Sequence, residues 1–312
     1  MYGDAMTTLQ VRRVPFDFDG DVPFCWHPSN PEFALQMNVI SLMIIGFEKY
    51  VVDATRAAIP RMTDPAVVEE AEAFLRQEAQ HARAHRAHVR ALDRQHPGLK
   101  AVVDAVVADY DRLFEAKPLE YHLAYVADLE ATFTPLFKQM LDHADELFRP
   151  GDERVASLFL WHFTEEIEHR GSALVVFDHV VGRPWYRLRQ LPSVLRHIGT
   201  VVTMTTDAIE RCVPLEDRLI SAKSVHPVRS ARRQLGEKLP FAARGIDMSH
   251  PTAYAPIPAA EQRRTYRRIL GSQSPRHDPA HQPLPAFATE WVERFDRGDD
   301  VSNWYTSQVA AG

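Results

Sequence analysis

Cysteine is almost absent from this sequence, in which 312 residues include two, Cys25 and Cys212. Two cysteines exclude a disulfide-stapled scaffold and a cysteine-rich zinc site, and they suit a reducing compartment such as the cytoplasm. Histidine, by contrast, occurs 15 times. If the chain binds a metal, we therefore expect carboxylates and imidazoles as ligands, without thiolate.

Long hydrophobic runs and a strong charge of one sign are also lacking. The longest apolar patch, residues 39–47, is less than half of the roughly 20 residues that a membrane-spanning helix needs. The first ten residues show no secretory signal. A total of 36 Lys and Arg against 42 Asp and Glu gives a net charge of −6, which favours neither nucleic acid nor an anionic membrane as a partner. We therefore expect a cytoplasmic protein that does not insert into membranes.

Proline is missing from four long stretches of the first 183 residues. An interior proline costs a helix about 3 kcal/mol, and these stretches are rich in the helix formers Ala, Leu, Glu, Arg and Gln. Asn30-Pro31 and Asp64-Pro65 are typical helix starts. No strand alternation or hairpin signal interrupts the pattern. The sequence predicts helices over residues 31–58, 64–95, 99–116, 119–148 and 152–181.

After residue 183 the chain is richer in proline and less regular. Further helices are predicted over residues 185–212, 228–237, 259–270 and 286–296, with a linker at 271–285. We predict an all-α fold in three parts. These parts are an N-terminal extension (1–29), a four-helix bundle (30–183) and a C-terminal helical and Pro-rich extension packed on the bundle (184–312).

Two of the long predicted helices carry a Glu-x-x-His pair, Glu78-Ala-Gln-His81 and Glu166-Ile-Glu-His169. Residues three apart project from nearly the same face of a helix, so the carboxylate and the imidazole of a pair can reach one point. A single pair is weak evidence, because acidic helices that contain histidine produce it by chance on a solvated face.

The other two long helices each carry a glutamate among apolar residues, Glu48 and Glu130. Burying a carboxylate is costly unless it is paired or binds a metal. Pairing with Arg or Lys is the alternative, but Lys49 lies about 100° around the helix from Glu48, and Glu130 has no basic residue three or four positions away. One Glu from each of two helices and Glu-x-x-His from two others is the ligand arrangement of di-iron and di-manganese bundles. We therefore predict two metal ions held by Glu48, Glu78, His81, Glu130, Glu166 and His169.

With these residues the chain resembles the ferritin-like di-iron carboxylate superfamily over about residues 30–182, which implies a ferritin-like bundle. The motif His162-x-x-x-Glu166-x-x-His169 is similar to that of the bacterial arylamine N-oxygenases, and this resemblance implies that His162 is a seventh ligand. The alternative is that His162 hydrogen-bonds a ligand. Residues 161–162 and 165–169 also look like a bacterial family labelled predicted metal-dependent hydrolase.

Two neighbouring residues complete the predicted site. Glu165 lies about 40° from His169 around the helix and is a candidate acceptor that orients an imidazole. His85 follows His81 by four residues and is a candidate for a similar supporting role, with an exposed or capping histidine as the alternative. Glu168 is expected to point into solvent.

Carboxylate and imidazole ligands suit iron, with manganese or zinc as alternatives. We therefore expect two Fe ions in an oxygenase that uses O₂ to hydroxylate or N-oxygenate an organic small molecule. The alternatives are a di-metal hydrolase and a non-catalytic, ferritin-like iron-binding protein. No flavin or nicotinamide fingerprint occurs, so an oxygenase needs an external electron donor. The expected partners are a small-molecule substrate, O₂ and that donor, with a homodimer as a further option.

Overall fold

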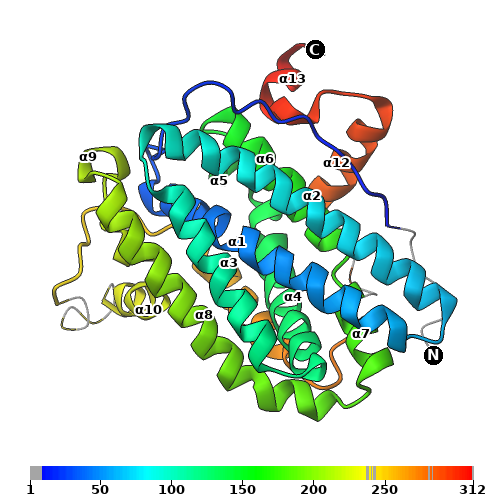
Figure 1. The fold of residues 1–312 in the computed structure, drawn as a ribbon. Helices are drawn as coiled ribbons and strands as arrows, with labels where there is room; N and C mark the ends of the chain where they lie inside the picture. The colour runs from blue at the N-terminus through cyan, green and yellow to red at the C-terminus, as the bar shows by residue number, and fades with distance from the viewer. Residues whose placement is uncertain are drawn as a thin grey trace.

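The structure is a computed structural model and describes residues 9–236, 239, 241, 244–279, 282 and 284–310. Within these residues every regular element is a helix, so the prediction of an all-α fold is confirmed. The first ten residues, for which no secretory signal is expected, lie outside the described part of the chain except for Leu9 and Gln10. Figure 1 shows long helices packed side by side, with the last helices lying on the outside of this group.

The first three helices begin and end almost where the sequence predicts. They are α1 (Pro31–Ala58), α2 (Pro65–Gln95) and α3 (Leu99–Ala116). The side chains of Asn30 and Asp64 each accept a hydrogen bond from a first-turn N–H, at 3.2 and 2.9 Å. These bonds satisfy N–H groups that have no partner inside the helix, and the prolines at the first position lose no hydrogen bond. Helix α1 packs against both α2 and α3, which fixes its buried face.

The two later bundle helices are each broken, so the predictions of unbroken helices over 119–148 and 152–181 are wrong. The third predicted helix divides into α4 (Leu119–Asp142) and α5 (Ala144–Leu147), and the fourth into α6 (Glu153–Glu168) and α7 (Ser172–Val180). At His169 the backbone changes direction with φ −94° and ψ 17°. The predicted metal ligand His169 therefore lies at the end of a helix and not within one.

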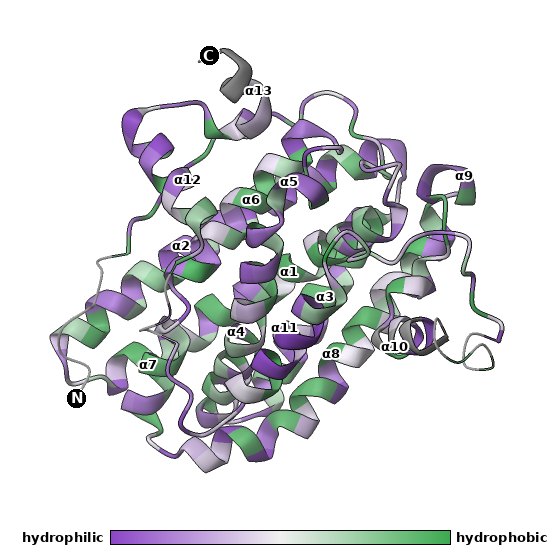
Figure 2. Cartoon of the chain, turned by 180° about the vertical axis from the view of Figure 1, so that it is seen from behind, coloured by the Kyte–Doolittle hydropathy of each residue, from purple (hydrophilic) through white to green (hydrophobic). Residues whose placement is uncertain are grey.

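The elements after residue 183 pack on the bundle. Helix α8 (Pro184–Cys212) lies against α3 and α4, and α11 (Ala259–Ser272) lies along α4, where Figure 2 shows it as largely hydrophilic. Trp291 and Trp304 join the same core as Trp161, so this region is part of the packed interior. The other elements are η1 (Ile59–Arg61), α9 (Leu215–Arg218), η2 (Ala222–Val225), α10 (Pro227–Gly236), α12 (Ala286–Arg297), η4 (Val301–Asn303) and α13 (Trp304–Ala310).

One helical stretch, Pro31–Arg61, is long and apolar enough by composition to cross a membrane. In the folded chain 72% of its apolar window is buried against other helices. This is the behaviour of a central core helix, whose apolar surface is covered by protein. Nothing else in the described part of the chain has the length and hydropathy of a membrane span.

Candidate metal centre

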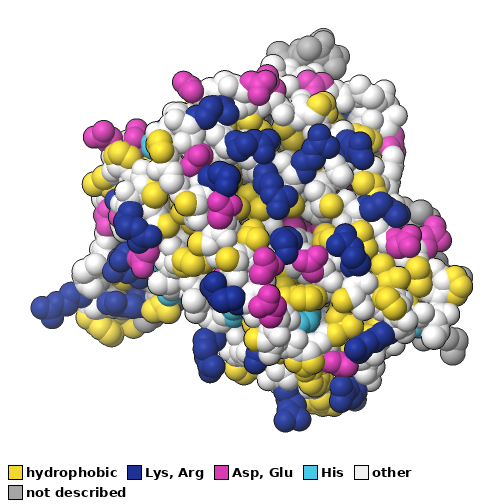
Figure 3. All heavy atoms as spheres, in the orientation of Figure 1, with side chains coloured by type: hydrophobic (Ala, Val, Ile, Leu, Met, Phe, Trp, Pro, Cys, Tyr) yellow, Lys and Arg dark blue, Asp and Glu magenta, His cyan; other side chains and the backbone are white. Residues whose placement is uncertain are grey.

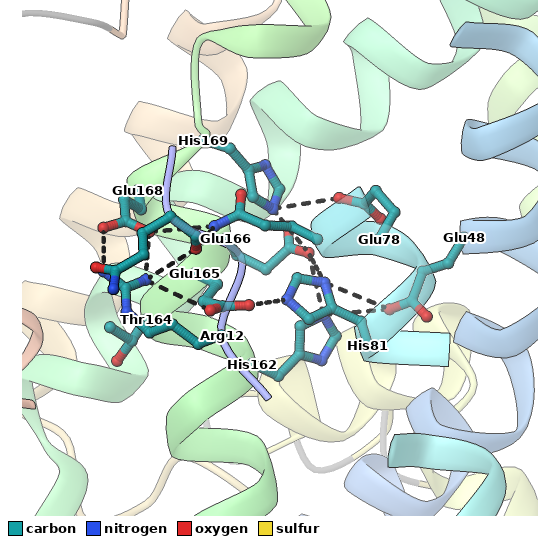
Figure 4. Close-up of polar contacts among 12 residues, drawn as sticks. Arg12, Glu48, Glu78, His81, His162, Thr164, Glu165, Glu166, Glu168 and His169 are labelled. Carbon is teal, nitrogen blue, oxygen red and sulfur yellow. Dashed lines mark hydrogen bonds and ion pairs between the residues drawn. The ribbon is translucent and has the colours of Figure 1, made fainter. Parts of the chain in front are cut away.

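The seven predicted ligands meet in the interior of the bundle, and none is more than 4% exposed. Helix α1 supplies Glu48, α2 supplies Glu78 and His81, and α4 supplies Glu130. His162 and Glu166 come from α6, and His169 comes from the residue directly after it. Figure 4 shows the side chains from α1, α2 and α6 pointing toward one another.

These side chains form two groups that share two members. Glu48, His81, His162 and Glu166 form one group, and Glu78, His81, Glu166 and His169 form the other. Within each group one ligand atom of every residue lies within 4.8 Å of the others. Two ligands on opposite sides of an ion, with bonds of about 2.1 Å, are about 4.2 Å apart. Each group is therefore close to the size needed to surround one ion.

Glu166 is the centre of this arrangement. Its Oε1 atom lies 3.0 Å from Nε2 of His162, and 3.6 Å from both Nδ1 of His81 and Nε2 of His169. A carboxylate in this position would be available as a ligand to both groups.

The other three glutamates lie at the edges of the two groups. Glu48 Oε1 is 3.4 Å from His162 Nε2, and Glu78 Oε1 is 3.2 Å from His169 Nε2. Glu130 Oε2 is 3.7 Å from His169 Nδ1. Glu130 belongs to neither of the two groups, but it is adjacent to the second.

The ring of His81 is held by a buried carboxylate. Nε2 of His81 is 2.9 Å from Glu165 Oε2, whereas Nδ1 faces Glu48 and Glu166 and makes no hydrogen bond with any described residue. Burial raises the pKa of Glu165 to about 8. Once this carboxyl is ionised it accepts from Nε2–H, and neutral His81 then presents an unprotonated Nδ1 to the cluster. Glu165, for which a role in orienting an imidazole is predicted, therefore contacts the imidazole of His81, which lies on another helix.

Arg12 joins this support from the N-terminal segment. Its guanidinium donates to both oxygens of Glu168, at 2.9 and 2.7 Å, and lies 3.4 Å from Glu165. The expectation that Glu168 points into solvent is therefore wrong, because a buried arginine pairs with it. No periodicity within a helix could have revealed Arg12, which lies 153 residues before Glu165.

His162 is held by a chain of buried side chains. Its Nδ1 atom lies 2.8 Å from Nε2 of His85. His85 Nδ1 is 2.8 Å from the hydroxyl of Ser41, which is in turn 2.9 Å from Nδ1 of His88. Ser41 precedes Glu48 by seven residues, a spacing that puts both on one face of α1, and this was the signal available in the sequence.

The hydrogen bonds from His162 through His85 and Ser41 to His88 all run in one direction when Nε2 of His162 faces a cation. That atom must then be unprotonated, so Nδ1–H of His162 donates to His85, and His85 Nδ1–H donates to the Ser41 oxygen. The Ser41 hydroxyl is then left to donate to His88. One requirement at the cluster therefore sets the tautomers of three histidines.

Burial controls the protonation of the cluster. It raises the pKa values of Glu48, Glu78 and Glu130 well above their ordinary range, and the negative charge of Glu166 raises them further. Burial likewise lowers the pKa of His81 to about 3 and that of His162 to about 4. Burial therefore favours the neutral form of each of these groups when no cation is bound.

Glu166 and His169 are the exceptions. Burial alone would raise the pKa of Glu166, but the charge of His169 and the hydrogen bond from His162 hold it well below its usual value. Burial alone would lower the pKa of His169, but the charge of Glu166 more than offsets this effect and raises it. Without a cation, these two residues form the ionic centre of the site.

The residues present fit two divalent cations. No Lys or Arg side chain of the described residues forms an ion pair with Glu48, Glu78, Glu130 or Glu166. Within the same part of the chain, both carboxylate oxygens of Glu48 and of Glu78 lack a hydrogen-bond donor. Buried polar atoms are rarely left without partners. Cations bound by these oxygens would supply the missing partners.

Comparison with known proteins identifies the family. A family model described as predicted metal-dependent hydrolase matches residues 10–240 of the 312. This range is more than half of the chain and contains all seven clustered residues, so the chain belongs to this family. Comparisons with curated proteins and with solved structures found no significant match.

Proposed function

Because the chain belongs to the family of predicted metal-dependent hydrolases, we propose that it is a di-metal enzyme that hydrolyses an ester, amide or phosphate-ester bond in a small molecule. The observation that carries this proposal is the pair of overlapping groups that share His81 and Glu166. Two ions held by shared ligands lie close enough to act on one bond. Sites of this kind occur in phosphatases and aminopeptidases, with ions about 3.5–4 Å apart.

Two divalent ions in such a site activate water at neutral pH and polarise the bond that is cleaved. The residues of the chain provide the setting for this chemistry. Glu166 would hold ions in both groups, whereas Glu48 and Glu78 would each contribute to one group. Ionised Glu165 would accept from Nε2–H of His81 and so leave Nδ1 of His81 unprotonated and directed at the cluster. Burial of all seven side chains limits access of bulk water and strengthens their electrostatic interactions.

Oxygenation with O₂ is a second candidate, which the ligand pattern favours. One Glu from each of two helices, with Glu-x-x-His from two others, is typical of di-iron and di-manganese carboxylate bundles. Helices α1 and α4 supply the single glutamates, and α2 and α6 supply the paired motifs. His162 adds a third imidazole without adding charge. This function would require iron and an external electron donor.

Metal exchange in the full chain separates the two functions. The metal-free protein is loaded either with Mn²⁺ or Zn²⁺, or without oxygen with two equivalents of Fe²⁺. Hydrolysis of a panel of chromogenic esters, amides and phosphate esters is measured for each form, and the iron form is mixed with O₂ in stopped flow. We expect hydrolysis by the Mn²⁺ or Zn²⁺ form, abolished in Glu166→Gln.

The outcomes that contradict hydrolysis are equally specific. Failure to hydrolyse the panel, together with a fast visible absorbance transient when the Fe²⁺ form meets O₂, would assign the site to oxygenation. Uptake of many more than two iron ions per chain would instead favour storage. A protein that binds no divalent ion would overturn both enzymatic candidates.

A further inference from the structure

A second feature lies on the outer side of helix α2, next to the metal-binding cluster. A cavity of about 340 Å³ opens between α2 and residues 12–16 of the N-terminal segment. Its charged lining residues are all arginines, namely Arg12, Arg13, Arg83 and Arg90. No acidic side chain of the described residues lines it. We call this feature the arginine pocket.

Helix α2 presents different side chains to its two sides. His81, His85 and His88 are fully buried and face the bundle interior, whereas Arg83 and Arg90 are exposed and line the pocket. Residues three, four and seven apart share a helix face, so each set forms a stripe. One helix therefore contributes a wall to the metal-binding cluster and a wall to the arginine pocket.

Three of the four arginines carry uncompensated charge. Arg12 is paired with Glu165 and Glu168. Arg13, Arg83 and Arg90 make no hydrogen bond or ion pair with any described residue. In a chain with a net charge of −6, three unpaired cations around one cavity form a local positive field. Figure 3 shows Lys and Arg side chains gathered on this face over α2.

Aromatic rings give the pocket an apolar part. Trp161 and Phe16 line it with ring centroids 5.4 Å apart. Trp161 is 1% exposed, and its ring also meets His81 at 5.0 Å, edge to face. A single indole therefore separates the pocket from a predicted metal ligand. A ligand resting on Trp161 would lie next to the cluster.

We propose that the arginine pocket binds a small organic anion, a carboxylate or a phosphate monoester, with its apolar body against Phe16 and Trp161. Guanidinium groups match both anions in shape and can donate two hydrogen bonds at once. The exposed position of these arginines requires a ligand that several of them contact together, since single surface charges contribute little. The inference that this anion is the substrate rests on the proposed function. The inference that the pocket binds an anion does not depend on it.

Calorimetric titration of the metal-free full chain tests binding without interference from anions that coordinate metal. The probes are phenyl phosphate, phenylacetate, inorganic phosphate and the neutral benzyl alcohol. We expect at least one of the two aromatic anions to bind more tightly than inorganic phosphate, and benzyl alcohol not to bind. The stronger of phenyl phosphate and phenylacetate identifies the anion class. Binding should weaken in 1 M salt, where the screening length falls to about 3 Å.

Three variants localise the binding. The double variant Arg83→Ala/Arg90→Ala should weaken the anion by about tenfold or more, because it removes two charge-assisted contacts. Ala87→Phe should weaken it by filling the cavity while keeping every charge. Arg76→Ala is the matched control, since Arg76 lies on the same helix and outside the pocket lining. Its affinity should equal that of the unaltered chain.

Equal binding of benzyl alcohol, or unchanged affinity in the double variant, would overturn the proposal. In the metal-loaded protein, a raised KM with nearly unchanged kcat for an anionic substrate in the double variant would connect the pocket to turnover. Binding that is lost in the double variant, in a protein that proves inactive as a hydrolase, would support the pocket and reject only the proposed function.

Discussion

The two ends of the buried cluster are held in different ways. At the His162 end, which comprises Glu48 and His162, helix α6 is regular and the ring is tied to the His85–Ser41–His88 chain. At the His169 end, which comprises Glu78, Glu130 and His169, α6 has already stopped, and the ring packs on Phe74 at 4.9 Å. A hydrogen-bonded network of side chains therefore positions the imidazole of His162, whereas a break in the helix backbone positions the imidazole of His169.

The largest effect is expected from a substitution of Glu166, which belongs to both groups of the cluster. Glu166→Gln keeps the shape of the side chain but removes the charge that both groups use. We expect the affinity for both ions to fall by more than about 100-fold, the upper range for loss of a residue that only supports a ligand. Equilibrium dialysis with Mn²⁺ or Zn²⁺ measures this change. Glu69→Gln, which alters an exposed glutamate of α2, is the control, and two tightly bound ions in Glu166→Gln would contradict the shared role.

Removing one imidazole from each end tests their independence. His162→Ala leaves the second group complete, and His169→Ala leaves the first group complete. Each variant should therefore keep one tightly bound ion per chain and lose most of its affinity for the other. Elemental analysis after dialysis gives the stoichiometry. Loss of both ions from either variant would mean that the two groups act as a single unit.

A smaller effect, on ion affinity at the His162 end alone, is expected when the hydrogen bonds that join His85, Ser41 and His88 are interrupted. Ser41→Ala interrupts the contact between His85 and His88, so His162 loses part of what fixes its ring and tautomer. Affinity for the ion at the His162 end should fall by about tenfold, the lower range for residues that support a ligand. The ion at the His169 end should be unaffected.

Ser172→Ala provides the mirror-image control for this prediction. Ser172 is buried beside the His169 end and donates its hydroxyl hydrogen to Glu70. It makes no contact with the chain that leads to His162. If Ser41→Ala and Ser172→Ala weaken the same ion, the hydrogen-bonded chain is not specific to one end.

The smallest expected effect is a dependence of stability on pH. Burial lowers the pKa of His88 to about 3, against about 6.5 in an unfolded chain. Between these values the unfolded state binds the extra proton, so this stabilisation is complete above about pH 6.5 and is lost as pH falls toward 3. The loss is at most about 1.4 kcal/mol per pH unit for one group.

Urea unfolding of the metal-free chain between pH 7 and pH 4.5 measures this dependence. The free energy of unfolding should fall with pH, and His88→Gln should fall less steeply than the unaltered chain. A variant with the same slope would show that His88 is accessible to protons in the folded state.

Local sequence signals were sufficient for the helices that have clear starts and stops. Asn30 and Asp64 precede prolines that open α1 and α2, and the predicted ends lie within a residue of those observed. The breaks at His143 and His169 were missed because neither residue is a proline or a glycine. At His169 the chain leaves the helix while its N–H still bonds to Glu165, a change that local propensity does not signal.

The residues of the candidate site could be predicted from the sequence, but the contacts between them could not. Spacing and apolar surroundings selected six of the side chains that the fold brings together, because residues three or four apart on a helix must share a face, and His162 was added by the resemblance to the arylamine N-oxygenases. The contacts of Glu165 with His81, and of Arg12 with Glu168, join segments far apart in sequence. Helix periodicity carries no information about such pairs.

The sequence by itself determined an all-α chain, the helices that carry the four glutamates, His81 and His162, and a ligand set without thiolate. Only the tertiary structure decided that His81 and Glu166 are shared between two groups, that Ser41 connects two histidines, and that arginines surround a cavity beyond Trp161. The reason is physical. Helix formation and side-chain periodicity are local, whereas the position of one helix face against another depends on packing of the whole core.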